Sequence, residues 1–168
     1  MKKTTFVRIW DQLRQKYGVY LRLIELLPEA QLQTTPIPGM RSPAELIAHL
    51  SSGIVRGIMQ GIAVGTVKQE DESAIALAFK DKKDVLDLAH ECWEEADRVA
   101  RQITEEQLDA TVNAWGAPMR ASALVYILAD ELVHHRGQLY VYARVLGAEP
   151  PFVWSHTDNA IEFAPRGP

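Results

Sequence analysis

A chain of 168 residues, of which 47% are hydrophobic and 24% are charged, has the length and composition of one globular domain with its own core. Its formal net charge of -4 at pH 7 removes the electrostatic argument for binding nucleic acid. The single cysteine, Cys92, excludes an internal disulfide and fits a reducing cytoplasm. We therefore expect one domain over residues 1–168.

The N-terminus begins with basic residues, as a signal peptide does, but it lacks a continuous apolar segment. Asp11, Arg14 and Lys16 interrupt the apolar residues that follow Phe6. No stretch approaches the roughly 18 consecutive apolar residues that a membrane-spanning helix needs. The sequence thus predicts a soluble cytoplasmic protein with no membrane partner.

Two amphipathic helices are predicted in the first part of the chain. Apolar residues at steps of three and four predict the first helix from about Thr5 to Leu27, ending before Pro28. Residues 31–39 are expected to form a loop. Ser42, Pro43 and Glu45 form a strong helix start, with a capping box, for a second helix that runs to about Gln60 and carries His49.

Two more helices are predicted after a long connection at residues 61–81, in which we expect one helical turn at 74–79. A connection of this length can cross the whole bundle, so the second and third helices could run parallel. An apolar stripe predicts the third helix over residues 85–103, and the fourth extends from about Ala121 to Gly147. No convincing strand is found. The sequence predicts an all-α four-helix bundle, followed by an extended C-terminal tail at about 148–168.

Glu131 and His135 are four residues apart on the last helix, so they share one face. Leu128, Leu139 and Tyr142 fall on roughly the same side, which indicates that this face is buried. A buried carboxylate and imidazole need a partner. The spacing leaves two possibilities open, a divalent metal ion or ordinary hydrogen bonding.

Three segments together resemble the DinB/YfiT-like metalloenzyme family. His134-His135-Arg136-Gly137-Gln138 begins a string that continues to Gly147 and carries most of the resemblance. The segment from Ser42 to Leu50 and the pair Trp115-Gly116 add to it. With four helices in this order, the resemblance covers nearly the whole chain.

The resemblance implies a bundle in up-down-down-up order and a divalent metal held by three histidines. His49 and His135 match two of these histidines, whereas Glu131 stands at the third position. A carboxylate is still a competent ligand, and two histidines with one carboxylate form a common open site for zinc, iron, nickel or manganese. We therefore predict a metal site formed by His49, Glu131 and His135.

The other polar residues are assigned less demanding roles. His134 is expected at a helix boundary or in solvent, His90 beside the third apolar stripe, and His156 exposed in the tail. Arg56 could meet an anionic substrate, although a solvated arginine is the commoner case. Arg136 and Gln138 are expected to form interhelical or metal-supporting hydrogen bonds, and Cys92 to be inert core.

Two functions from different classes follow. Characterised relatives of the family are thiol-dependent transferases and isomerases, so the resemblance implies a metal-dependent enzyme that acts on a small molecule, with a low-molecular-weight thiol. Transfer from the thiol or hydrolysis is expected at the open site, and no catalytic base is assigned. The alternative is a non-catalytic, stress-associated binding protein with a structural or vestigial metal site. A homodimer is expected.

Overall fold

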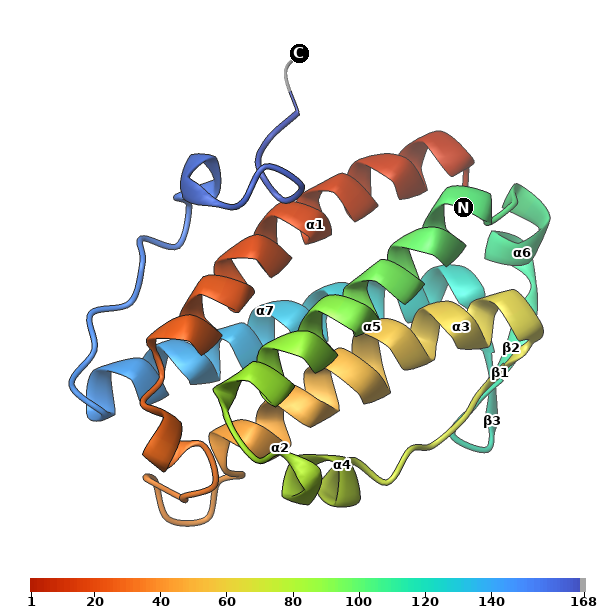
Figure 1. Ribbon diagram of the computed structural model, residues 1–168. Helices are drawn as coiled ribbons and strands as arrows, with labels where there is room; N and C mark the ends of the chain where they lie inside the picture. Colours follow the sequence, from red (N-terminus) through yellow and green to blue (C-terminus); the bar gives the residue numbers. More distant parts are fainter. Residues whose placement is uncertain (167–168) are drawn as a thin grey trace.

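The structure is a computed structural model that describes residues 1–166 (Figure 1). Its long helices pack side by side, which confirms the predicted all-α four-helix bundle. The second of these helices is continuous but contains a π-helical segment, η2, in its middle. The bounds are α1 (Lys3–Leu26), α2 (Pro43–Ala48), η2 (His49–Arg56), α3 (Gly57–Val64), α5 (Lys82–Gln102) and α7 (Ala121–Val145).

The long helices run in two directions. α1 and α7 run one way, whereas the α2–α3 helix and α5 run the other way (Figure 1). Hydrogen bonds between helix ends hold this arrangement: Lys3 Nζ, at the start of α1, donates to the carbonyl oxygen of Ala100 at 2.8 Å, near the end of α5. Lys82 Nζ, at the start of α5, donates to the carbonyl oxygen of Glu25 near the end of α1. The connection at 65–81 carries the chain back along the bundle.

Local sequence signals set the ends of the second helix. Ser42 Oγ accepts from the Glu45 amide at 3.2 Å, and the Glu45 carboxylate accepts from the Ser42 amide at 2.7 Å, which confirms the predicted capping box. The helix continues past Gln60 to Val64, and Gly65 ends it with a left-handed φ of 87°.

This helix corrects the expectation that no stretch approaches a membrane-spanning length. Among the described residues, Pro43–Val64 is long and apolar enough to span a membrane by length and composition. However, 61% of its apolar window is buried inside the bundle, as is usual for the core helix of a globular protein. The apolar character is therefore accounted for by packing against the other helices.

The expectation of no strands is wrong, because three short strands form a small sheet at one end of the bundle. β1 (Thr66–Val67) pairs in parallel with β2 (Thr111–Ala114), and β2 pairs antiparallel with β3 (Ala117–Arg120). Trp115 and Gly116 join β2 to β3 with positive φ angles of 51° and 85°, as a tight hairpin requires. The connection between α3 and α5 therefore pairs with the connection between α5 and α7.

Both connections also contain short helices. α4 (Glu72–Ala78) begins two residues before the predicted turn, because the Asp71 side chain caps the amide of Ala74. α6 (Glu105–Asp109) follows α5 directly. The buried contact of α4 with α2 is made by alanines, with Ala76 against Ala44 and Ala48, and Ile75 and Phe79 pack partly buried around it. The small alanine side chains let the crossover lie close to the second helix.

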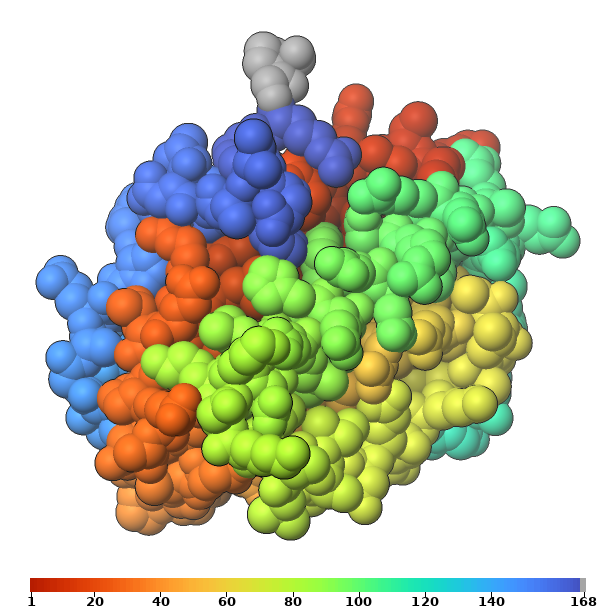
Figure 2. Space-filling view, viewed as in Figure 1, coloured from red at the N-terminus to blue at the C-terminus, as the bar shows by residue number. Residues whose placement is uncertain are grey.

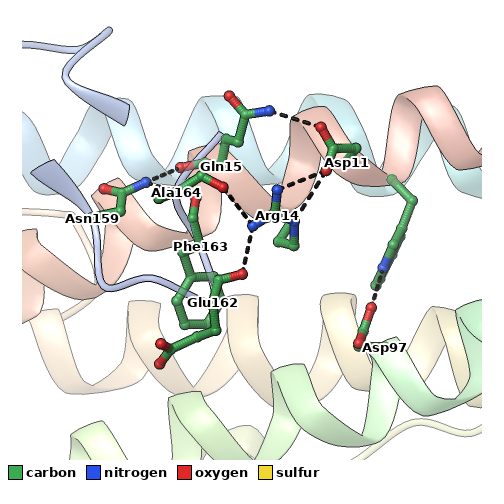
Figure 3. Close-up of polar contacts among 9 residues, drawn as sticks. Asp11, Arg14, Gln15, Asp97, Asn159, Glu162, Phe163 and Ala164 are labelled. Carbon is green, nitrogen blue, oxygen red and sulfur yellow. Dashed lines mark hydrogen bonds and ion pairs between the residues drawn. The ribbon is translucent and has the colours of Figure 1, made fainter. Parts of the chain in front are cut away.

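The tail is docked on α1 rather than free, and it includes a short 3₁₀ helix, η3 (His156–Asp158). Arg14 donates to the carbonyl oxygens of Glu162 and Ala164, and Asn159 donates to that of Gln15 at 2.9 Å (Figure 3). Figure 2 shows these last residues spread over α1 beside α5. Residues 167–168 of the predicted tail lie outside the described part.

Only some of the apolar residues of the tail are buried. Phe163 is buried and stacks near Tyr17 and Trp93, and Val153 is partly buried against the core. Phe152, Trp154 and Ile161 are exposed. Gly18 makes the docking possible, because a Cβ atom there would lie 2.5 Å from both Asn159 Nδ2 and Phe163 Cβ.

This contact predicts that Gly18→Ala destabilises the fold by about 1–3 kcal/mol, because the new methyl group overpacks the seat of the tail. Gly137→Ala on α7 is the matched control, since a Cβ there meets nothing within 4 Å. We expect the control to gain about 0.5–1 kcal/mol from helix propensity. Urea unfolding measures the free energy of unfolding of both variants. Equal values would contradict the proposed close contact of Gly18 with the tail.

Candidate metal centre

The structure brings His49, Glu131 and His135 together from two helices. His49 is the first residue of the π-helical segment η2, and Glu131 and His135 lie one turn apart on α7. One ligand atom from each side chain lies within 4.8 Å of the other two. The two imidazole rings meet edge to face with their centroids 4.8 Å apart. The convergence expected from the sequence is therefore present, and it spans two separate helices.

The outer nitrogen of each imidazole is held by an oxygen acceptor. His49 Nδ1 lies 2.8 Å from Glu72 Oε2, and His135 Nδ1 lies 2.8 Å from Gln138 Oε1. Since neither oxygen can donate, Nδ1 carries the proton in both rings. In the neutral tautomer, each Nε2 atom then presents a lone pair toward the centre of the site.

Those lone pairs face a carboxylate oxygen. His135 Nε2 lies 2.8 Å from Glu131 Oε2, and His49 Nε2 lies 3.7 Å from the same atom. Three electron-rich atoms this close repel one another unless a cation lies among them. The choice is therefore between a proton and a metal ion, and the set of two nitrogens and one oxygen suits a divalent transition metal.

The surroundings of His135 disfavour the proton. Burial lowers the pKa of His135, and its hydrogen bonds to the acceptor oxygens of Gln138 and Glu131 oppose this only in part. A neutral imidazole is the form that binds metal. The residues present therefore fit a divalent metal ion, which His49 Nε2, His135 Nε2 and the Glu131 carboxylate would hold.

Sequence reasoning missed Glu72, which lies in the polar connection after the second helix. α4 places its carboxylate against His49, and this pairing of a carboxylate with a ligating histidine is typical of metal sites. Gly53 allows the approach, because a Cβ atom there would lie 2.0 Å from Glu72 Oε1. Two features of the sequence point to this contact: the acidic run that ends at Glu72, and Gly53 one turn after His49. Which acidic residue reaches His49 depends on the path of the connection, which the sequence does not show.

The three side chains open into a cavity of about 450 Å³. Its wall combines apolar groups with hydrogen-bonding side chains; the residues that line it besides the three ligands are Gly39, Met40, Arg41, Leu46, His134, Gln138 and Tyr142. Glu131 is 35% exposed, whereas His135 is only 10% exposed. An ion at this place would therefore have protein on one side and the cavity on the other.

Most other candidate residues lie elsewhere. Arg56 pairs with Glu70 at 2.7 Å and does not line the cavity, so it cannot meet a substrate there. His90 lies across the bundle near Phe163, and burial raises the pKa of the Cys92 thiol to about 12, as expected for inert core. His134 is exposed but lines the cavity, where Gln138 Nε2 contacts its Nε2 at 3.2 Å. Arg41 was not singled out from the sequence.

Comparison with known proteins gives a consistent result. A sequence model of the DinB superfamily matches residues 12–139. The uncharacterized protein YjoA of Bacillus subtilis (strain 168) is 27% identical over 137 residues, covering 77% of this chain and 84% of that protein. The crystal structure of YjoA, a DinB-like protein, matches with a TM-score of 0.71 at 25% identity, covering 87% of this chain and 96% of that chain.

Two further crystal structures share the fold at lower identity. A DinB-like protein from Bacillus cereus ATCC 10987 has a TM-score of 0.72 at 19% identity, covering 89% of this chain and 95% of that one. YfiT from Bacillus subtilis has a TM-score of 0.61 at 16% identity, covering 84% and 89%. YfiT is described as a probable metal-dependent hydrolase with an unusual four-helix bundle topology.

The geometry predicts that untagged protein purified without chelator carries about one divalent metal ion per chain. We expect His49→Ala and His135→Ala to lose it, because each removes one of three donor atoms. His90→Ala is the control, since His90 lies outside the cavity. Elemental analysis by mass spectrometry gives the metal content; wild-type protein without metal would contradict the assignment.

The support of His49 predicts a second, graded effect. Glu72→Gln keeps the shape of the side chain but weakens the hydrogen bond that orients His49, so metal affinity should fall about 10–100-fold. Gly53→Ala should act in the same direction by displacing Glu72. Competition with a coloured chelator measures both affinities. Wild-type affinity in both variants would show that Glu72 does not orient the ligand.

Proposed function

The chain belongs to the DinB superfamily, and we propose that it is a divalent-metal-dependent enzyme that transfers a low-molecular-weight thiol to a small electrophilic substrate. The observation that supports this most directly is the shared direction of His49 Nε2, His135 Nε2 and Glu131 Oε2 beside a cavity. Hydrolysis is a second candidate, favoured by the description of the structurally similar YfiT.

The ligand set leaves room for a substrate. A divalent ion held by His49, His135 and Glu131 would supply a Lewis acid, which would favour the deprotonated form of a thiol or a water molecule at neutral pH. Two neutral imidazoles and one carboxylate would not cancel the charge of a divalent ion, so these residues would leave the site attractive to an anionic nucleophile. The Nδ1 hydrogen bonds keep both imidazoles oriented during the reaction.

His134 is well placed to move the proton that the nucleophile loses. It lines the same cavity, is exposed, and contacts Gln138, whose other amide atom accepts from His135. A neutral imidazole carries a nitrogen lone pair, so it can accept a proton from a thiol or a water molecule. Gln138 thus links the proton-accepting histidine to the ligand histidine.

We further propose that the substrate is a small molecule and that the reaction takes place in a reducing cytoplasm. The cavity volume suits a small ligand. Cys92 is fully buried, so it does not compete with an external thiol for the centre. Homodimerisation remains a prediction.

Cobalt-substituted protein distinguishes the candidates. If the protein binds and transfers thiols, adding 2-mercaptoethanol should produce a thiolate-to-cobalt charge-transfer band. The protein should also catalyse conjugation of this thiol to an electrophile such as 1-chloro-2,4-dinitrobenzene, and the rate should depend on the metal. His134→Gln should lower the rate while leaving the metal content unchanged, because it removes the proton acceptor and no ligand.

The other outcomes are equally informative. Metal-dependent hydrolysis of a nitrophenyl ester without thiol conjugation would favour the hydrolase. Stoichiometric metal with neither a thiolate band nor turnover, and a loss of stability in His49→Ala, would favour the non-catalytic alternative with a structural site.

A further inference from the structure

Arg136 is a buried charge without a partner, on a different face of α7 from the metal centre. Its side chain is 4% exposed. Among residues 1–166 it makes no ion pair, and its Nη1 atom is buried without a hydrogen-bond acceptor. Burial of an unpaired guanidinium is costly, so native proteins seldom leave one in this state.

The other unpartnered groups lie beside it. Within the described chain, the buried side-chain nitrogen and oxygen atoms that lack a partner are Arg136 Nη1, Tyr140 OH and His156 Nε2. Arg136 and Tyr140 lie one turn apart on α7. Besides burial, the charge of Arg136 acts on the pKa values of Tyr140, His156 and Lys16, as it does only on groups close to it. They come from α1, α7 and the docked tail. The unsatisfied polar groups are thus gathered in one place.

The charge of this place is also unbalanced. Lys16 and Arg136 pair with no carboxylate in the described residues. Arg22 and Arg144 also add positive charge around Tyr140, and the carboxylate that pairs with Arg22, Asp158, lies 3.8 Å away and is 62% exposed. A water molecule could complete the hydrogen bonds, but it would leave the buried positive charge unbalanced.

We propose that Arg136, Tyr140, His156 and Lys16 form a binding site for a small oxyanion, of the size of inorganic phosphate or sulfate, enclosed between α1, α7 and the C-terminal segment. A guanidinium, a phenol, an imidazole and an ammonium can all donate to it, and an oxyanion offers only acceptors. The tail supplies His156 and is itself held by Arg14 and Asn159 (Figure 3). The ligand therefore joins the tail to the bundle.

This site is separate from the metal centre. The cavity beside the metal ligands is lined by none of these four residues. Arg136 follows His135 directly, but successive side chains on a helix point about 100° apart. The two sites therefore lie on different faces of the same helix.

Inorganic phosphate is the probe. Isothermal titration should show one phosphate per chain, and the midpoint of thermal unfolding should rise with phosphate beyond its rise in sodium chloride of equal ionic strength. Tyr140→Phe should weaken phosphate binding about tenfold, because it removes one hydrogen bond to a charged ligand. Tyr126→Phe is the control, since Tyr126 is on the same helix and 54% exposed.

Two more variants complete the test. His49→Ala should keep phosphate binding, which separates this site from a metal-bound anion. Arg136→Gln should abolish binding; should it fail to fold, Tyr140→Phe still decides. Absence of phosphate binding, equal affinity in wild type and Tyr140→Phe, or an equal effect of sodium chloride would each overturn the proposal.

Discussion

Repulsion among three electron-rich atoms is the constraint around which this bundle is built. His49 Nε2, His135 Nε2 and Glu131 Oε2 meet where two helices cross, and both outer nitrogens are fixed by oxygen acceptors. A hydrophobic core alone would gain nothing from such a cluster, because each polar group had to leave water. The cluster is stable only if something positive joins it, which is why its geometry bears on function rather than on packing.

The long connection at residues 65–81 contributes to this cluster. A parallel pair of helices requires the chain to return along the bundle, and here that return also carries α4 past the start of the π-helical segment. Alanines at the contact of α4 with α2 bring the two close, and Gly53 leaves room for Glu72 to reach His49. The π-helical segment begins at His49 itself, and such segments often occur at functional sites. The connection, Gly53 and the π-helical segment therefore all help to position the His49 side chain.

Features of the fold that depend on local sequence could be predicted. Features that depend on contacts between residues far apart in the sequence could not. The capping box at Ser42, the stop before Pro28 and the i,i+4 pair of Glu131 and His135 are local, so their patterns are visible in the sequence. The register of β1 with β2 joins residues nearly fifty positions apart, and no local alternation announces it. Glu72 and Arg41 belong to the site only because of where their connections run. Arg56 was a false candidate for a similar reason, since the same connection supplies Glu70, which pairs with it away from the cavity.

Neighbouring residues of the last helix, α7, lie in two environments of opposite electrostatic character. On the face of His135, acceptor atoms are in excess and the site calls for a cation. On the face of Arg136, donors are in excess and the buried charge calls for an anion. A helix can hold both because the 100° step between successive residues sends adjacent side chains to different neighbours, here η2 on one side and the docked tail on the other. The segment from His134 to Gln138 thus contributes residues to two separate sites. A different part of the chain completes each site.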